Sequence, residues 1–299
     1  MNRQEQPKIT VLLTVFNGEQ YLSEAIDSIL CQTFNDFEFI IINDGSSDKS
    51  AEIAERYAQK DSRIILIHQK NEGLTKSLNK GLSLAKGEYI ARMDADDISE
   101  PERLQVQAQF LDQNQDVGVV GIDGLVIDEE GHEVGKVGHP VLHNEITALL
   151  LLDNRFTHSS VMFRAKLSHL YGVYDETLIM AQDYDLWLRF FMYTKMANIP
   201  RPLHKWRANI TSGISINKRD EQIVFRDKVR QNFLEKHFSK SGDHINLILS
   251  NLRNCPTDRV LLAHLKRVYL SLSLVHRLYL RLKVFIFFRQ EALLKVISH

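Results

Sequence analysis

The 299-residue sequence contains only two cysteines, Cys31 and Cys255, and they lie far apart in the chain. Neither belongs to the closely spaced pair that a zinc site or a dithiol redox motif requires. We expect both to be reduced thiols, which is typical of a protein that works in the cytoplasm.

The sequence also has little net charge, only −1, so no overall field directs the protein to nucleic acid or to an acidic partner. No uncharged apolar run reaches the roughly 18 residues of a membrane span. The first ten residues, "MNRQEQPKIT", lack the apolar core of a signal peptide. We therefore expect a cytoplasmic protein with no nucleic-acid partner.

Two glycine-rich phosphate-binding loops are missing as well. A dinucleotide-binding fold carries G-x-G-x-x-G after its first strand, but this chain has "TVFNGEQ" at 14–20. A G-x-x-x-x-G-K-[ST] loop does not occur either. Any phosphates would therefore be held by a metal ion rather than by a glycine cradle.

The chain is 44% hydrophobic, enough to bury a core in one large domain or two modest ones. Its first 120 residues alternate short β-rich runs with helical periods, which predicts a parallel sheet covered by helices on both faces. The expected strands are 9–16, 37–43, 63–68, 88–93 and 117–121, and the expected helices are 21–30, 50–59, 74–85 and 104–111.

The pattern changes twice along the rest of the chain. Residues 140–210 predict an α+β half packed beside the first, with helices at 143–152 and 184–191 and strands at 159–164 and 203–207. Beyond about residue 216 the chain reads as helical. Its last part, 259–299, carries eight Lys and Arg residues against one acid, Glu291. This basic tail fits a helical-bundle surface, a dimer contact or an amphipathic segment on anionic lipid.

Three carboxylates, those of Asp94, Asp96 and Asp97, follow the fourth expected strand with no Lys or Arg among them. Ligands bind at the carboxyl ends of parallel strands, so this cluster is placed at the site edge of the sheet. One interpretation is a helix start, with Ser99 and Glu102 as a capping box and the acids favoured by the helix dipole. The other is a divalent cation, which one or two carboxylates hold while substrate phosphates supply further ligands. We favour the cation.

A second candidate follows the second expected strand, in "INDGSSDKS" at 42–50. Its Asp-Gly-Ser is typical of a turn, and Ser47 or Asp48 can cap the next helix. Asp44 is placed at the strand tip, where its carboxylate can accept a hydrogen bond from a nucleotide base or a ribose hydroxyl.

Four segments, in order, resemble the successive motifs of family 2 glycosyltransferases. They are "TVFNGEQYLSEAIDSILCQTF", "FEFIIINDGSSD", "NEGLTKSLNKGLSLAKGEYIARMDADD" and "AQDYDLWLR", and the resemblance covers about residues 7–210. These are inverting enzymes that use nucleotide sugars. The resemblance implies an α/β, GT-A (Rossmann-like) fold with a mostly parallel sheet flanked by helices. Residues 1–215 would form this domain, with 1–121 as the nucleotide-binding half and 122–215 as the acceptor half, followed by a helical C-terminal region at 216–299.

The same resemblance implies roles for the residues of the first half. Thr14 and Phe16 would line the base pocket, and Asp44 would contact the base. Asp94 would bind the ribose or the metal, and Asp96 would be the main ligand of Mn²⁺ or Mg²⁺. The family's usual Asp-Asp-Gly-Ser begins with Asn43 here, which leaves the second acid in place.

Other residues have a role in the resemblance and an equally plain structural alternative. Asn71 matches the family's Asn-x-Gly segment, where helix entry is the alternative to a ligand contact. His158 stands where such enzymes place a histidine near the diphosphate or metal, and a partly buried structural histidine is the alternative. From position and composition, Arg207 and the loop 208–215 would close over the diphosphate.

Inverting transfer needs one carboxylate to take the proton of the attacking acceptor hydroxyl. In "AQDYDLWLRF" we assign this base to Asp183, whose alternative is a helix N-cap; Asp185 is the next candidate. Asp185 and Arg189, four residues apart, indicate an ion pair on a helix surface. Trp187 is expected in the core or in an acceptor wall.

The sequence thus predicts a metal-dependent inverting glycosyltransferase. It would move a sugar from a nucleoside-diphosphate sugar, with UDP as the favoured nucleotide, to a glycan or lipid-linked glycan. The resemblance places this reaction in bacterial cell-surface polysaccharide or lipopolysaccharide synthesis, at the inner face of the cytoplasmic membrane if 259–299 binds lipid. The alternatives are a sugar-nucleotide-forming nucleotidyltransferase and a non-catalytic nucleotide-sugar-binding module.

Overall fold

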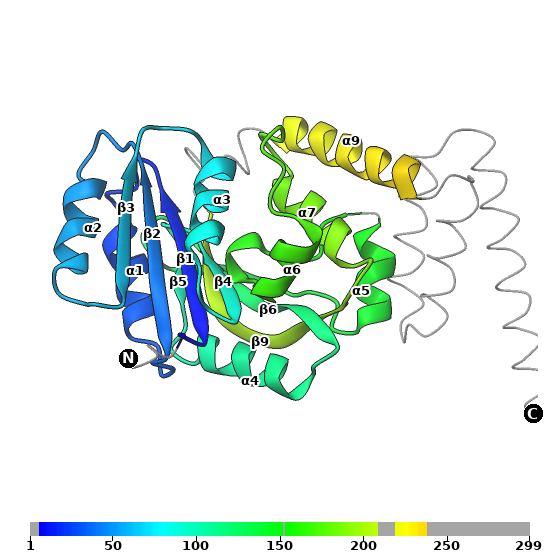
Figure 1. Ribbon diagram of the computed structural model, residues 1–299, viewed down its shortest axis with the longest axis horizontal. Helices are drawn as coiled ribbons and strands as arrows, with labels where there is room; N and C mark the ends of the chain where they lie inside the picture. Colours follow the sequence, from blue (N-terminus) through cyan, green and yellow to red (C-terminus); the bar gives the residue numbers. More distant parts are fainter. Residues whose placement is uncertain (1–5, 152, 209–218, 238–299) are drawn as a thin grey trace, which may run out of the picture.

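The computed structural model describes residues 6–151, 153–208 and 219–237. Within these ranges a nine-stranded sheet forms the centre of the protein (Figure 1). Eight of its strands follow the order β3-β2-β1-β4-β8-β6-β9-β5, and β7 pairs with β6. The strands are β1 (Ile9–Val15), β2 (Phe37–Asp44), β3 (Ile64–Gln69), β4 (Tyr89–Met93), β5 (Ile98–Ser99), β6 (Val117–Ile127), β7 (Glu133–Val137), β8 (Met162–Arg164) and β9 (Lys195–Arg207).

The first four long strands are parallel and supply the site edge of the sheet. Every residue of β1 is buried, as expected for a strand covered on both faces. Thr14 lies opposite Ile42 of β2, and Leu13 lies opposite Met93 of β4. The carboxyl ends of β1, β2 and β4 therefore meet at one edge. The mostly parallel sheet is confirmed, with β8, β5 and β7 antiparallel to their neighbours.

Helices cover both faces of the sheet, and the alternation of side chains along β1 shows why. Val11 and Leu13 point into one core, whereas Leu12 points into the other. Full burial of such a side chain stabilises the fold by roughly 1.5–3 kcal/mol. The first core is covered by α1 (Leu22–Leu30), α2 (Ser50–Ala58) and α4 (Arg103–Gln113), and the second by α3 (Leu74–Leu84), α5 (His143–Leu150), α6 (Ala165–Tyr171), α7 (Gln182–Phe190) and α9 (Arg219–His237).

Two strands are much longer than their sequence predicts. The run at 117–121 continues to Ile127 as β6, and the strand expected at 203–207 begins at Lys195 as β9. Pro200 and Pro202 break the β pattern of the sequence because proline cannot donate a ladder hydrogen bond. In the structure the β6–β9 ladder accommodates them with register shifts near Asp123.

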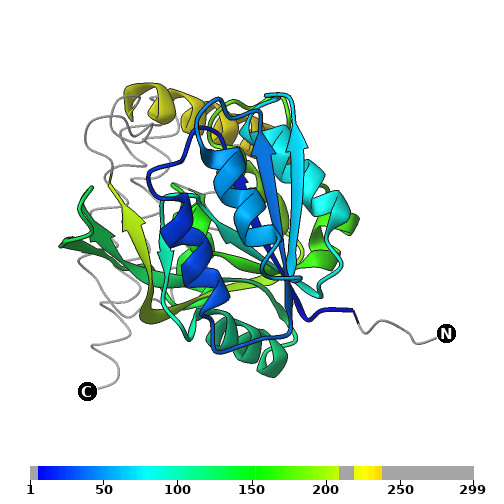
Figure 2. The ribbon, with the colours of Figure 1, turned by 90° about the vertical axis from the view of Figure 1, so that its left-hand side faces the viewer.

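Helix α9 is the described part of the predicted helical C-terminal region. Its Val229 and Phe233 are buried in the same core as α7, and the rings of Phe233 and Phe191 lie 5.7 Å apart. In both views α9 lies at the end of the molecule toward which β2 and β3 point (Figure 2). The basic tail 259–299 lies outside the described residues. Among the helices that are described, none combines the length and the apolar character needed to cross a bilayer.

Candidate active site at the carboxyl ends of the strands

The loops that follow β1 and β2 interlock at the site edge. Asn17 has a positive φ of 53°, a conformation that asparagine tolerates better than most residues. Its side-chain oxygen accepts a hydrogen bond from the backbone N–H of Ser47 at 2.8 Å, and its own N–H donates to Ser46 Oγ at 3.0 Å. Asp48 accepts hydrogen bonds from the N–H groups of Glu19 and Ser50, at the start of α2. These contacts hold two loops in one position.

The carboxylate of Asp44 is buried and held within the protein. It accepts hydrogen bonds from Gln69 Nε2 at 2.7 Å and from the N–H groups of Glu72 and Gly73, both at 2.9 Å. The next residue, Gly45, has φ +73°, and a Cβ there would lie 2.6 Å from the backbone nitrogen of Asn71. Asp44 therefore shapes the loop that carries Asn71, and its base contact stays a prediction.

The hydrogen bonds of Asp44 imply a pH-dependent contribution to stability. Burial opposes its charge, but the donors from Gln69, Glu72 and Gly73 outweigh burial and lower the pKa. The ionised group therefore stabilises the fold fully above its unfolded pKa of about 3.9, and this stabilisation is lost as pH falls through the lower folded pKa. We expect Asp44→Asn to lower the free energy of unfolding by about 2 kcal/mol at pH 7, since a donor replaces an acceptor. Urea unfolding at pH 7, 4 and 3 measures the difference in unfolding free energy between wild type and Asp44→Asn. This difference should shrink only below pH 4, and an undiminished difference at pH 3 would contradict the prediction.

The three acids after β4 have three different environments. Asp97 is 1% exposed, and its Oδ2 lies 2.8 Å from His204 Nε2. Its Oδ1 accepts a hydrogen bond from the backbone N–H of Arg207 at 2.9 Å. It anchors the end of β9 beneath the loop. The alternative interpretation as a capping box is wrong, because Ser99 lies in β5, Glu102 makes no side-chain cap, and α4 begins at Arg103.

Asp97 is accordingly expected to matter for stability. Asp97→Ala leaves His204 Nε2 without its carboxylate partner and the Arg207 N–H without an acceptor, which should cost about 3 kcal/mol of unfolding free energy. Asp97→Asn keeps one acceptor oxygen and should lose less. Urea unfolding followed by circular dichroism measures both variants. A wild-type midpoint for Asp97→Ala would mean that these contacts do not support the fold.

Asp94 and Asp96 remain available to a ligand. Asp94 Oδ1 lies 2.5 Å from Nη2 of the buried Arg92. Burial opposes ionisation of Asp94, but the charge of Arg92 and its hydrogen bond lower the pKa of Asp94. In the described ranges, no residue other than Asp96 itself donates a hydrogen bond to the Asp96 carboxylate. Burial, and then the charges of Asp97 and Asp94, raise its pKa to about 7. Crowded carboxylate oxygens of this kind fit Mg²⁺ or Mn²⁺, because the cation supplies the missing positive charge.

Another acidic group lies on the turn between β6 and β7. Asp128, Glu130 and His132 place ligand atoms within 4.8 Å of one another, and no second group of three or more meets that criterion in the described part of the chain. Asp128 already accepts the N–H groups of Glu130 and His132 at 3.1 and 2.8 Å. This arrangement accounts for the cluster as a stabilised turn.

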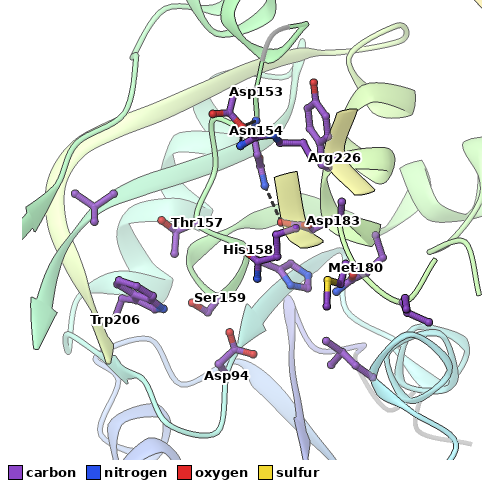
Figure 3. Close-up of a pocket in the computed structure, with 17 residues that line it drawn as sticks. Asp94, Asp153, Asn154, Thr157, His158, Ser159, Met180, Asp183, Trp206 and Arg226 are labelled. Atoms are coloured by element: carbon purple, nitrogen blue, oxygen red, sulfur yellow. Dashed lines mark hydrogen bonds and ion pairs between the residues drawn. The ribbon is translucent and has the colours of Figure 1, made fainter. Parts of the chain in front are cut away.

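A pocket of about 460 Å³ lies beside the acidic loop (Figure 3). Its wall combines residues from distant parts of the chain, among them Asp94, Asn154, His158, Asp183, Gln222 and Arg226. The fold therefore brings the predicted base Asp183 and the predicted ligand Asp94 to the same cavity, with the His158 ring labelled between them (Figure 3).

Asp183 lies in the first turn of α7, with its side chain in the pocket. The N-cap alternative is wrong, since α7 begins at Gln182 and its N-cap residue, Ala181, has a left-handed conformation with φ 58°. Asp183 Oδ2 accepts a hydrogen bond from Asn154 Nδ2 at 2.7 Å. Asp185 does not line this pocket. Its Oδ2 accepts a hydrogen bond from Arg189 Nε at 2.9 Å, which confirms the predicted ion pair.

His158 faces the pocket as an uncharged ring. Burial, followed by the charge of Arg92, lowers its pKa to about 4. Its Nε2 lies 2.8 Å from the hydroxyl of Tyr174, a contact that gives the ring a fixed position. Trp187 is fully buried and contacts the His158 ring edge-on, which confirms its place in the core.

Arg207 does not act as a closing residue. Its side chain is buried, with Nε donating to the Asp96 carbonyl at 2.9 Å and Nη2 bonded to Glu24 at 2.6 Å. Its guanidinium also lies 4.1 Å from the centre of the Tyr21 ring. It joins the acidic loop to α1, and the predicted loop 208–215 lies outside the described residues except for Ala208.

The remaining predicted residues lie at the same edge. Thr14 is buried near the end of β1, Phe16 is 53% exposed just beyond it, and Asn71 is exposed before α3. Sequence reasoning missed Asn154 and Arg226. Asn154 lies four residues before His158, which the sequence analysis did identify, but nothing in the local pattern marks Asn154 itself.

Comparison with known proteins agrees with this geometry. The family described as "Glycosyl transferase family 2" matches residues 10–166. An uncharacterized glycosyltransferase of Haemophilus influenzae is 30% identical, over 93% of both chains. The amylovoran biosynthesis glycosyltransferase AmsE of Erwinia amylovora is 34% identical, over 78% of this chain and 87% of AmsE.

Solved structures share the fold at lower identity. S. aureus TarS 1–349 in complex with UDP superimposes with a TM-score of 0.60 at 19% identity, covering 92% of this chain and 86% of that one. The mannosyltransferase PcManGT of Pyrobaculum calidifontis, in complex with GDP-Man and Mn²⁺, gives a TM-score of 0.57 at 15% identity, covering 94% and 85%. The GT-A-like α/β fold is thereby confirmed, and the chain belongs to glycosyl transferase family 2, a family of transferase enzymes.

Proposed function

We propose that this protein is an inverting glycosyltransferase that moves a sugar from a nucleoside-diphosphate sugar to a hydroxyl acceptor. The observation that carries this proposal is the pocket shared by Asp94, after β4, and Asp183, at the start of α7. One carboxylate lies on the donor side, at the carboxyl ends of the parallel strands. The other is available to the acceptor.

The reaction needs one bond formed and one broken at the anomeric carbon. Asp183 takes the proton of the acceptor hydroxyl as its oxygen attacks that carbon. The bond between the anomeric carbon and the diphosphate oxygen breaks on the opposite side, and the nucleoside diphosphate leaves with the electron pair. A single displacement of this kind inverts the configuration and needs no covalent enzyme intermediate.

The donor side rests on the residues of the first half. Asp96, with Asp94, would hold Mn²⁺ or Mg²⁺, which when bound neutralises charge on the diphosphate leaving group. Thr14 and the exposed Phe16 would line the base pocket, and Asn71 lies on the loop that Asp44 holds. The uncharged His158 would serve by hydrogen bonding and not by charge.

The substrate class is supported by the relatives. TarS and PcManGT were solved with UDP and GDP-Man, which supports a nucleoside-diphosphate sugar here, with UDP as the favoured nucleotide. The name of AmsE refers to biosynthesis of amylovoran. We infer a glycan or lipid-linked glycan acceptor in cell-surface polysaccharide synthesis, on the cytoplasmic side of the membrane.

A donor screen tests the proposal. The full-length protein is incubated with UDP-, GDP- and dTDP-sugars, with Mn²⁺ or with EDTA, and released nucleoside diphosphate is measured. We expect release from one nucleotide class, dependent on metal. Metal-dependent binding of nucleoside diphosphates by calorimetry, without release from any donor, would instead support a binding module.

A further inference from the structure

A chain of contacts links α9 to Asp183. Arg226 Nη1 lies 2.7 Å from Asp153 Oδ1, and the same oxygen accepts the backbone N–H of Asn154 at 2.8 Å. Asn154 Nδ2 then donates to Asp183 Oδ2 at 2.7 Å. Figure 3 shows these side chains along one wall of the pocket. We call Arg226, Asp153 and Asn154 the α9–base link.

The side-chain amide of Asn154 has a defined orientation. Its Oδ1 accepts the backbone N–H of Phe156 at 3.1 Å, so its NH₂ group is the one that faces Asp183. The amide is neutral, and it orients one carboxylate oxygen without adding a positive charge. Within the described residues no donor is bonded to the other oxygen, Asp183 Oδ1. With respect to the described residues, that oxygen can accept a hydrogen bond from an acceptor hydroxyl.

Helix α9 is held firmly enough to serve as the support of this link. Gln222, Arg226, Val229 and Phe233 follow one another at intervals of three or four residues, so they lie on one face of the helix. Val229 and Phe233 are buried in the core with α7, whereas Gln222 and Arg226 reach the pocket. The apolar half of this face thus fixes the position of the polar half.

We propose that Arg226, through Asp153 and Asn154, positions the carboxylate of Asp183 for proton transfer. Asn154 and Arg226 are therefore positioning residues, and α9, beyond the stretch matched by the family, completes the active site. The inference rests on the proposed function, because it takes Asp183 as the base. A misplacement of a reacting group by about 1 Å can cost roughly a hundredfold in rate, so an effect of this size is expected from the link.

Kinetics of four variants test the role in catalysis, with the donor identified by the screen. We expect Asn154→Ala to lower kcat by about tenfold to a hundredfold, with the donor KM changed less than about twofold. Arg226→Gln should lower kcat less, and Arg226→Lys should restore part of the loss. Lys228→Gln, which removes a positive charge from the exposed side of the same helix, should leave kcat unchanged.

The double variant Asn154→Ala/Arg226→Gln separates a link from two independent structural effects. Residues that act in series should give a double variant no slower than Asn154→Ala alone, whereas independent losses multiply. Multiplied losses, or a wild-type kcat in Asn154→Ala, would overturn the inference.

Hydrogen exchange of the full-length protein tests the link without any activity. Loss of the Arg226 contact should speed exchange of the amides in 153–156 by about tenfold in Arg226→Gln, and not in Lys228→Gln. Unchanged exchange would overturn the inference even in an active enzyme. Faster exchange in Arg226→Gln, together with a wild-type protein that turns over no donor, would overturn the proposed function itself, and the base with it.

Discussion

Asp183→Asn is expected to remove turnover while leaving the donor bound. General-base catalysis contributes about a hundredfold to ten-thousandfold, so kcat should fall by that factor when the amide can no longer take the acceptor proton. Because Asp183 lies in the first turn of α7 and not among the residues after β1, β2 and β4, the metal-dependent Kd for the nucleoside diphosphate should change little. Released nucleoside diphosphate and calorimetry measure the two quantities.

The matched control for this experiment is Asp185→Asn, two residues along the same helix. Asp185 is paired with Arg189 and does not line the pocket, so its loss should affect stability more than rate. If Asp183→Asn kept a wild-type rate, the base assignment would be wrong. Wild-type circular dichroism and melting temperature for Asp183→Asn would show that a lost rate is not a folding defect.

Asp96→Asn is expected to abolish metal-dependent binding of the donor. Its carboxylate is the one in the acidic loop that the protein leaves without a side-chain partner in the described ranges. Asp97 is paired with His204, and one oxygen of Asp94 is paired with Arg92. Replacing an anionic ligand by an amide removes a charge that the cation needs. We expect donor affinity in Mn²⁺ to fall at least about a hundredfold, to the level that wild type shows in EDTA.

Asp128→Asn is the matched control for Asp96→Asn, because it alters the other acidic group of the described structure. It should leave the manganese dependence of donor binding unchanged. The reverse pattern, with Asp128→Asn losing the metal effect and Asp96→Asn retaining it, would move the metal to the β6–β7 turn and contradict the proposed site.

Several features could be predicted because they depend on neighbours in the chain. Continuous apolar runs such as that of β1 must be buried on both faces, which determines a parallel sheet and brings Thr14, Asp44 and Asp94 to one edge. The helix that carries Asp183 was predicted at 184–191 from the period of its apolar residues. In the structure it begins two residues earlier, at Gln182.

The different roles of the three aspartates in the acidic loop could not be predicted from the sequence. No Lys or Arg lies among the three acids, yet Arg207 and His204, more than a hundred residues later, come to lie beside Asp97. Hydrogen bonds over such a separation depend on the packing of β9 against β5 and β6, which local pattern does not encode.

By itself the sequence determined the class of fold, the edge that carries the site and the acids that could act there, because alternating burial and strand ends are local properties. Only the tertiary structure decided which acids remain free, that Asp94 and Asp183 share one pocket, and that α9 reaches Asp183 through Asn154. The physical reason is that a hydrogen bond joins whichever groups the folded core places within 3 Å, at any distance along the chain.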